Sequence, residues 1–318
     1  MKVLQAVLWA ALAAFSLQVQ AWPDKPVRVI ISFTPASATD IVGRIVAAKL
    51  AEYWGQPVVP ENRSGAGGSL GSNVVAQAAP DGYTLLINSN AHAVNPAIYV
   101  KLPYETTKDF TDIAPLSELP NVLVVNGGSR FKTLADLVGY GKANPGKINF
   151  GHAGVGSGTH LNTVKLITAA GIDVTQVPFK GTPEVVAAIF SGAVDCYWVP
   201  ISAGVSNIRA AKLHALAVST GKRSPLLPDL ATTAEAGVKG ADFGLWFGLW
   251  GPAGMAPELT SKINADVRKA LADPGVLEKL KNTGNTPLDM SPPEFAKFVR
   301  SEIEDYQRVV RAAGIKPQ

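Results

Sequence analysis

The sequence predicts an α/β protein with mainly parallel sheets that are covered by helices on both faces. Three observations indicate it: short apolar, β-branched runs such as residues 27–33, helical periodicity after most of these runs, and glycine-rich loops between the two. Strands that alternate with helices favour parallel pairing. The chain has 318 residues, enough for two medium-sized domains with a core each.

The first strand, loop and helix set the pattern for the rest of the chain. Residues 27–33 are apolar, residues 34–38 are small or carry hydroxyls, and from Thr39 to Gly55 the apolar spacing is helical. Unpaired N–H groups and the positive end of the dipole make such a helix start a site for an anion. The alternative is an ordinary βα unit in which Thr39 or Asp40 is the N-cap.

The remaining elements follow the same alternation. Thr133 with Asp136 resembles a capping box, and Thr182 is expected to be the N-cap of a helix with a proline in its first turn. Residues 101–115 are predicted to be irregular. Strands are predicted in residues 57–60, 83–88, 121–126, 147–150, 174–178, 194–199, 214–218 and 243–250. Helices are predicted in residues 70–78, 95–99, 133–144, 160–171 and 257–272, after Thr182, and in residues 291–311.

Residues 1–21 resemble a signal peptide, with one charge at Lys2, an apolar run and small residues before Trp22. The apolar run is short and interrupted for a membrane span, although an N-terminal anchor is the alternative. We therefore expect an exported, soluble protein that is cleaved after about Ala21. The formal net charge of +4 is mild, which argues against a nucleic-acid partner. Cys196 lies in an apolar run and is expected in the core.

Three loops are expected at the carboxyl ends of strands, where ligands bind in open α/β sheets. They are residues 34–39, 89–92 and 154–159, and they offer backbone N–H groups and hydroxyls rather than fixed charges. Because two of them belong to one half of the molecule and the third to the other, we expect a cleft between two lobes. The candidate ligand-binding residues in and beside these loops are Thr34, Pro35, Ala36, Ser37, Thr39, Asp40, Ser89, Asn90, His92, Gly156, Ser157 and Thr159.

Further candidates lie outside the three loops. Phe179 precedes Lys180, which is either near an anionic ligand or a solvated turn residue. Asp195 is expected at a strand end near the cleft, and Trp198 and Trp246 lie on strands that could reach it. For the tryptophans the alternative is a place in the core. For Asp40 it is ordering of its own loop, and for His92 it is a structural role.

The sequence shows no pattern typical of catalysis or metal binding. Residues 154–158 lack the lysine of a P-loop, and Thr159 stands where a dinucleotide loop has its third glycine. Ser157 lacks the glycine spacing of a nucleophile elbow. No metal-ligand spacing connects the histidines, which are His92, His152, His160 and His214. We therefore expect a protein that is not an enzyme and has no cofactor or metal.

Several segments, in order along the chain, carry the motifs of a known family. They are residues 22–28, 33–40, 61–68, 80–85, 92–99, 154–161, 177–181, 192–195 and 246–249. In these segments the chain resembles the Bug proteins, which are periplasmic solute-binding (TctC-like) components of tripartite tricarboxylate transporters. The family usually has Pro-Gly-Gly where this chain has Pro35-Ala36-Ser37, which changes the space at the usual carboxylate position and leaves the ligand's identity open.

The resemblance implies a two-lobed periplasmic binding protein fold of type II, with the ligand cleft between the lobes. Lobe 1 would comprise residues 22–125 and 245–318, and lobe 2 the inserted residues 126–244. Strands near Leu123 and Trp246 would cross between them. Carboxylates would be held by N–H groups, hydroxyls and waters of the first loop and of the loop in lobe 2.

The predicted function is capture of a small organic carboxylate by lobe closure and delivery to the permease subunits of a tripartite tricarboxylate transporter. The ligand would be a dicarboxylate, a tricarboxylate or an aromatic acid. Neutral donors can give micromolar affinity, about −8 kcal/mol, without the cost of a buried ion pair. The alternatives are a ligand-dependent sensory partner of a membrane receptor kinase and an exported enzyme of the same fold.

Overall fold

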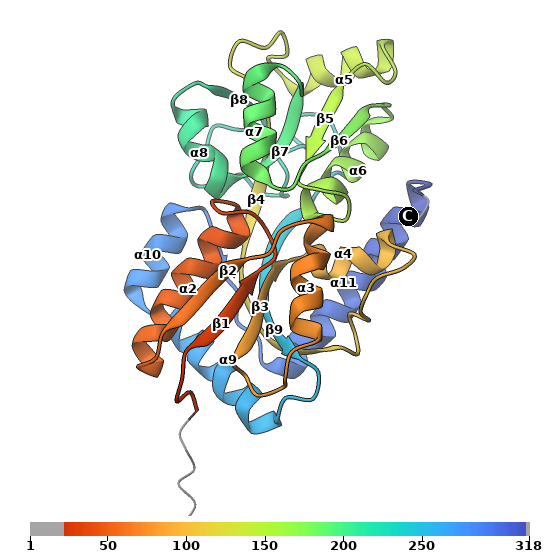
Figure 1. The fold of residues 1–318 in the computed structure, drawn as a ribbon. Coiled ribbons are helices and arrows are strands. Elements are labelled where there is room, and N and C mark those ends of the chain that lie inside the picture. Colours follow the sequence, from red (N-terminus) through yellow and green to blue (C-terminus); the bar gives the residue numbers. More distant parts are fainter. Residues whose placement is uncertain (1–21, 316–318) are drawn as a thin grey trace, which may run out of the picture.

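The computed structural model describes residues 22–315, so the predicted signal peptide lies outside the described residues. Within this range, every helix is too short or too polar to span a bilayer. Figure 1 shows a lower part that contains β1, β2, β3 and β9 and an upper part that contains β5 to β8, with β4 between them. We call the lower part lobe 1 and the upper part lobe 2, and we propose the predicted boundaries, 125/126 and 244/245, as their division.

The strands described form one mixed sheet in the order β2-β1-β3-β9-β4-β7-β5-β6, and β8 and β10 pair with β4. The strands β1, β2 and β3 are parallel to one another, as are β5, β6 and β7. In contrast, β4, β8 and β9 pair in antiparallel fashion. The prediction of mainly parallel sheets therefore holds for the outer strands and is wrong for the centre.

In lobe 1, helices cover both faces of the sheet. The strands are β1 (Val27–Ile31), β2 (Val58–Asn62), β3 (Thr84–Ser89), β9 (Gly244–Pro252) and β10 (Thr286–Pro287). The helices are α2 (Ala38–Trp54), the 3-10 turn η1 (Ala66–Gly68), α3 (Ser69–Ala76), α4 (Ala91–Ile98), α9 (Pro257–Leu271), α10 (Pro274–Asn282) and α11 (Pro292–Ala312). Val42 of α2 packs in the same core as Ile31, whereas Phe295 of α11 packs with Ile30 on the opposite face. This alternation follows from the period of two along β1.

In lobe 2, the same arrangement recurs on a smaller scale. The strands are β5 (Asn149–His152), β6 (Thr175–Pro178), β7 (Cys196–Pro200) and β8 (Leu213–Val218). The helices are α5 (Leu134–Ala143), α6 (Gly158–Ala170), α7 (Thr182–Ser191) and α8 (Ile201–Arg209). The capping box of Thr133 and Asp136 at the start of α5 is confirmed, and Cys196 is fully buried as predicted.

The strand β4 (Phe110–Asn126) joins the lobes. Its first part pairs with β9 and its last part with β7 and β8. The predicted irregular segment therefore ends at Phe110 rather than at Pro115. The pairing with β9 shifts register on either side of Ala114 and Pro115, and such bulges allow a strand to contain proline. In the described residues, the strand β9 pairs with β3 and with the first part of β4. We therefore propose that the return crossing lies in residues 242–244, just before Trp246.

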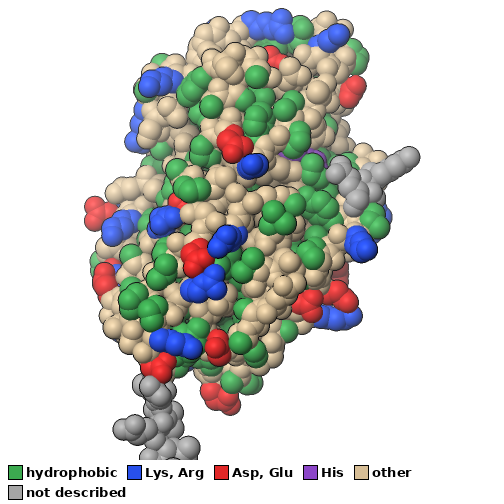
Figure 2. All heavy atoms as spheres, viewed as in Figure 1, with side chains coloured by type: hydrophobic (Ala, Val, Ile, Leu, Met, Phe, Trp, Pro, Cys, Tyr) green, Lys and Arg blue, Asp and Glu red, His purple; other side chains and the backbone are tan. Residues whose placement is uncertain are grey.

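Charged side chains of both signs are mixed on the molecular surface. Figure 2 shows Lys and Arg beside Asp and Glu on the face that carries α2, α3 and α7, without a large area of one sign. This agrees with the mild net charge and gives no support to a polyanionic partner on this face.

Candidate ligand-binding site

A small cavity lies where the two lobes meet. Its volume is about 20 Å³, which is room for about one water molecule. Lobe 1 and lobe 2 both contribute to its wall. The lining residues are Phe33, Ser37, Ala38, Thr39, Ser89 and Leu245 from lobe 1, and Ala153, Ser157, Gly158, Thr159, Thr182 and Pro200 from lobe 2.

Helices from both lobes begin at this cavity. Ser37 is the N-cap of α2, Ser157 is the N-cap of α6, Thr182 is the first residue of α7 and Pro200 precedes α8. The N–H groups of a first helical turn have no partner within the helix, and the dipole adds partial positive charge there. None of the lining residues carries an ionisable side chain. The cavity therefore favours an anion through neutral groups alone.

The hydroxyl groups at the cavity are already oriented by the backbone. Ser37 Oγ accepts from the N–H of Asp40 at 3.3 Å, and Ser157 Oγ accepts from the N–H of His160 at 3.1 Å. Thr159 Oγ1 accepts from the N–H of Ala153 at 3.0 Å and lies 3.1 Å from Ser157 Oγ. Because a hydroxyl that accepts from an N–H keeps its own proton to donate, these side chains can donate to the oxygens of a carboxylate.

Asp40 lies behind the first loop and holds its shape. Its carboxylate accepts from the N–H of Ala36 at 2.9 Å, from Asn62 Nδ2 at 2.8 Å and from Arg44 Nε at 2.9 Å. Burial alone would raise the pKa of Asp40, but the hydrogen bonds from Arg44, Asn62 and Ala36 outweigh it and lower the pKa. Ala36 has a φ of 61°, a left-handed conformation that an alanine adopts at a cost. Asp40 therefore orders its own loop, as the alternative interpretation held.

Five candidates lie beside the cavity wall rather than in it. Pro35 and Ala36 are exposed, and Thr34 faces Gly181 of lobe 2. Asn90 packs behind Gly158, while Gly156 packs against Asn95 of lobe 1. A sixth, Phe179, lines a groove of about 460 Å³ outside the cavity, together with Gly67, Tyr99, Val155 and Lys180.

His92 and the two tryptophans lie in the cores of the lobes. His92 is fully buried, with its ring centroid 4.5 Å from those of Phe110 and Trp250. Trp246 Nε1 donates to Glu302 Oε2 at 2.7 Å beneath α11. Trp198 packs with Leu123 on one face of β7, whereas Tyr197 points to the other face. The structure therefore contradicts the expectation that these side chains reach the cleft. It supports the core alternative for the two tryptophans and a structural role for His92.

Asp195 lies at the wrong end of its strand for ligand binding. Its Oδ2 accepts from the N–H of Asn149 at 2.8 Å, where β5 begins. Pro200, at the other end of β7, lines the cavity. Because β5 and β7 are parallel, their amino ends lie together at the edge of the sheet that faces away from the cavity.

Several lining residues were not among the candidates predicted from the sequence, although two of them lie in the predicted loops 34–39 and 154–159. They are Phe33, Ala38, Ala153, Gly158, Thr182, Pro200 and Leu245. Thr182 had a signal, since it begins a helix directly after a predicted strand. Its Oγ1 lies 2.9 Å from the hydroxyl of Tyr197. No sequence signal marked Pro200 or Leu245 as a lining residue, because their positions depend on antiparallel pairing with β4 and on how the lobes meet.

The histidines near the cavity are neutral. The rings of His152 and His160 lie 4.6 Å apart. Burial lowers the pKa of His152 to about 3 and that of His160 to about 4. The Oγ of Ser157 contacts the backbone N–H of His160 rather than its ring, so it has no base beside it. Across residues 22–315, no three His, Cys, Asp or Glu side chains gather closely enough to hold a metal ion.

Comparison with known proteins agrees with this geometry. The family model of the tripartite tricarboxylate transporter family receptor, TctC, matches residues 42–315. BugT of Bordetella pertussis is 32% identical over 297 residues, which cover 93% of this chain and 91% of BugT. A structure of an R. palustris protein with adipate has a TM-score of 0.90 and 32% identity, covering 93% of this chain and 100% of that one. MatC from Rhodopseudomonas palustris with bound malate has a TM-score of 0.86 and 34% identity, covering 91% and 100%. The chain therefore belongs to the TctC family of tripartite tricarboxylate transporter receptors, and the Bug proteins are among its relatives.

Proposed function

We propose that this protein is a periplasmic binding protein that captures a small organic carboxylate between its lobes and delivers it to the permease subunits of a tripartite tricarboxylate transporter. The observation that carries the proposal is the convergence of hydroxyls and helix starts from both lobes on one uncharged cavity. The relatives solved with adipate and with malate support the ligand class. The family description supports the transporter partner, and residues 1–21 support export.

Lobe closure is the central step of this function. The cavity holds about one water molecule, so a carboxylate enters only when the lobes separate. A ligand that contacts Ser37 on one side and Ser157 on the other binds the closed state better than the open one, and this difference drives closure. We infer that the hinge consists of the β4 crossing and of residues 242–244.

The lining favours an aliphatic carboxylate over an aromatic one. The argument for an aromatic ring depended on Trp198 and Trp246, which lie in the cores of the lobes. Phe33 is the aromatic side chain in the described lining, beside small residues and hydroxyls. We therefore propose a short dicarboxylate or tricarboxylate, which presents a negative group to the helix starts of each lobe.

A thermal-shift series with malate, adipate, citrate and benzoate tests this assignment. A ligand that binds only the native state raises its stability, by about 2.7 kcal/mol at one hundred times the dissociation constant. We expect a higher melting temperature with at least one of the first three acids and no change with benzoate. The absence of any shift in the whole series would reject a carboxylate ligand.

A pair of substitutions at Ser157 tests the site itself. Ser157→Asp and Ser157→Asn both keep an N-cap for α6 and add the same bulk, but only Asp adds a charge. Repulsion between two carboxylates about 4 Å apart is about 4 kcal/mol at an effective dielectric constant of 20. We expect calorimetric affinity for the best acid to be at least about 100-fold weaker in the Asp variant than in the Asn variant. Equal affinities would place the ligand elsewhere.

A further inference from the structure

The two lobes also touch outside the cavity, and a glycine stands at two of these contacts. A Cβ added to Gly67 of lobe 1 would lie 2.1 Å from the carbonyl oxygen of Val155 in lobe 2. A Cβ added to Gly181 of lobe 2 would lie 2.0 Å from Thr34 Oγ1 in lobe 1. Real Cβ atoms essentially never come so close, so a methyl group at either position forces its neighbour to move. At Gly67 that neighbour is the backbone of lobe 2, and at Gly181 it is the Thr34 side chain of lobe 1.

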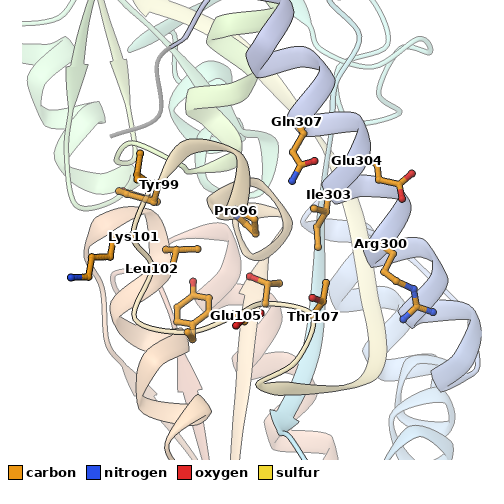
Figure 3. Close-up of a pocket in the computed structure, with 13 residues that line it drawn as sticks. Pro96, Tyr99, Lys101, Leu102, Glu105, Thr107, Arg300, Ile303, Glu304 and Gln307 are labelled. Atoms are coloured by element: carbon orange, nitrogen blue, oxygen red, sulfur yellow. The ribbon is translucent and has the colours of Figure 1, made fainter.

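Tyr99 joins the same contact. Its hydroxyl donates to the carbonyl oxygen of Val155 at 2.8 Å, so the peptide group that packs on Gly67 is also hydrogen-bonded to lobe 1. Figure 3 shows Tyr99 at the end of α4, on the rim of a hollow of about 600 Å³ between this segment and α11. Tyr99 also lines the groove that contains Gly67 and Val155.

Asn95 supports the contact from within lobe 1. Its Nδ2 lies 3.3 Å from both the carbonyl oxygen of Gly67 and the hydroxyl of Tyr104. A Cβ added to Gly156 would lie 2.4 Å from Asn95 Oδ1. One buried side chain thus touches both the lobe 1 turn and the lobe 2 loop, which fixes their relative positions.

We propose that Tyr99, Gly67 and Gly181 form a latch that holds the lobes closed and sets how long the ligand is retained. None of the three lines the cavity, so they are positioning residues that act on the ligand without touching it. The proposal rests on the proposed function, because retention is a property of ligand binding. Since the contacts exist only when the lobes are closed, their loss accelerates ligand release and leaves association unchanged.

Tyr99→Phe removes only the hydroxyl group of the latch. We expect dissociation of malate or adipate, followed by stopped-flow fluorescence, to be about 2- to 12-fold faster than in the wild type, the range for one hydrogen bond. The association rate should be unchanged. Tyr140→Phe is the control, because Tyr140 packs against Phe131 and Arg130 within lobe 2. Equal dissociation rates in the wild type and in Tyr99→Phe would overturn the role of Tyr99.

The glycine variants test the latch without any ligand. Gly181 has a φ of −177°, so Gly181→Ala brings no backbone strain and only the clash between lobes. Gly67→Ala brings strain as well, and its control is Gly55→Ala, which has nearly the same positive φ and no atom within 4 Å of the added Cβ. We expect faster amide hydrogen exchange in residues 65–68 and 153–157 for Gly67→Ala and Gly181→Ala, but not for Gly55→Ala.

The dissociation and hydrogen-exchange experiments together distinguish a failure of the proposed ligand class from a failure of the latch. If neither malate nor adipate binds the wild type, the proposed ligand class fails, and hydrogen exchange alone decides on the latch. If exchange in both loops is the same in all three glycine variants as in the wild type, the latch is rejected even where a carboxylate binds.

Discussion

At the scale of single residues, the buried histidines couple stability to pH. Burial lowers the pKa of His92 to about 3, that of His152 to about 3 and that of His160 to about 4. An unfolded histidine has a pKa of about 6.5. Below that pH the unfolded chain binds protons that the folded chain does not bind. Folding stability is therefore fully present above about pH 6.5 and decreases as the pH falls toward the folded pKa values.

We predict that urea unfolding shows lower stability at about pH 5.5 than at about pH 7.5, with each buried histidine contributing about 1.4 kcal/mol per pH unit below its unfolded pKa. His92→Asn should remove about one third of this histidine slope, because it removes one of the three groups. An identical slope in His92→Asn and in the wild type would contradict the assignment.

The residue scale also shows which cavity residues the sequence could predict. Ser37, Ser89 and Ser157 follow or end strands that run toward the cavity, and chain polarity alone places them there. Asp195 and Trp198 were misplaced because their positions depend on the direction and register of β7, which the local sequence does not encode. That the cavity serines bind a ligand stays a prediction.

At the scale of elements, β9 depends on a glycine for its contact with α11. A Cβ added to Gly248 would lie 2.5 Å from Phe295 Cζ and 2.6 Å from Trp250 Cη2. We predict that Gly248→Ala lowers the free energy of unfolding by about 1–3 kcal/mol, the usual cost of overpacking. Gly244→Ala in the same strand meets no atom within 4 Å and should change stability by less than about 0.5 kcal/mol. Equal urea midpoints for the two variants would contradict this account.

The elements differ in how clearly the sequence marks them. The helix α11 was predicted to begin at Ser291, and the structure shows a capping box of Ser291 and Glu294 at this start. The first part of β4 was missed because Pro115 and Pro120 argue against a strand, and only bulges formed with β9 accommodate Pro115. The helices α8 and α10 were also missed, since each follows the preceding element after at most two residues, with no loop to separate them.

At the scale of the whole molecule, Ser219 ties the two chain crossings to each other. Its Oγ donates to the carbonyl oxygen of Phe243 at 2.6 Å and accepts from the N–H of Asn121 at 3.0 Å. Its backbone bonds to the same two residues. Asn121 belongs to the β4 crossing, and Phe243 to the return crossing.

We predict that Ser219→Ala lowers the free energy of unfolding by about 1–3 kcal/mol, because it leaves buried backbone groups without a partner. The control is Ser191→Ala, whose hydroxyl reaches only the carbonyl oxygen of Ala188 in its own helix and which should cost less than about 0.5 kcal/mol. Equal stability of both variants in urea would show that the crossings are not held together through Ser219.

Neither the contacts between the two lobes nor the hydrogen bonds of Ser219 could be predicted from the sequence. Alternation of strands and helices predicts lobes, and motif resemblance predicts the family. The contact of Gly67 with Val155, in contrast, joins loops far apart in the chain, and no local propensity specifies it.

The continuity of β4 has a consequence for how such proteins can be recombined. A fragment cut at residues 126–244 would take β7 and β8 away from the strand that separates them and would expose their inner edges. A chimera that takes lobe 2 from a relative therefore has to take the end of β4 as well, from Asn121 onward, because this part of β4 pairs with β7. In chimeras made to exchange ligand preference between family members, the fusion point should therefore lie within β4 rather than at residues 125/126.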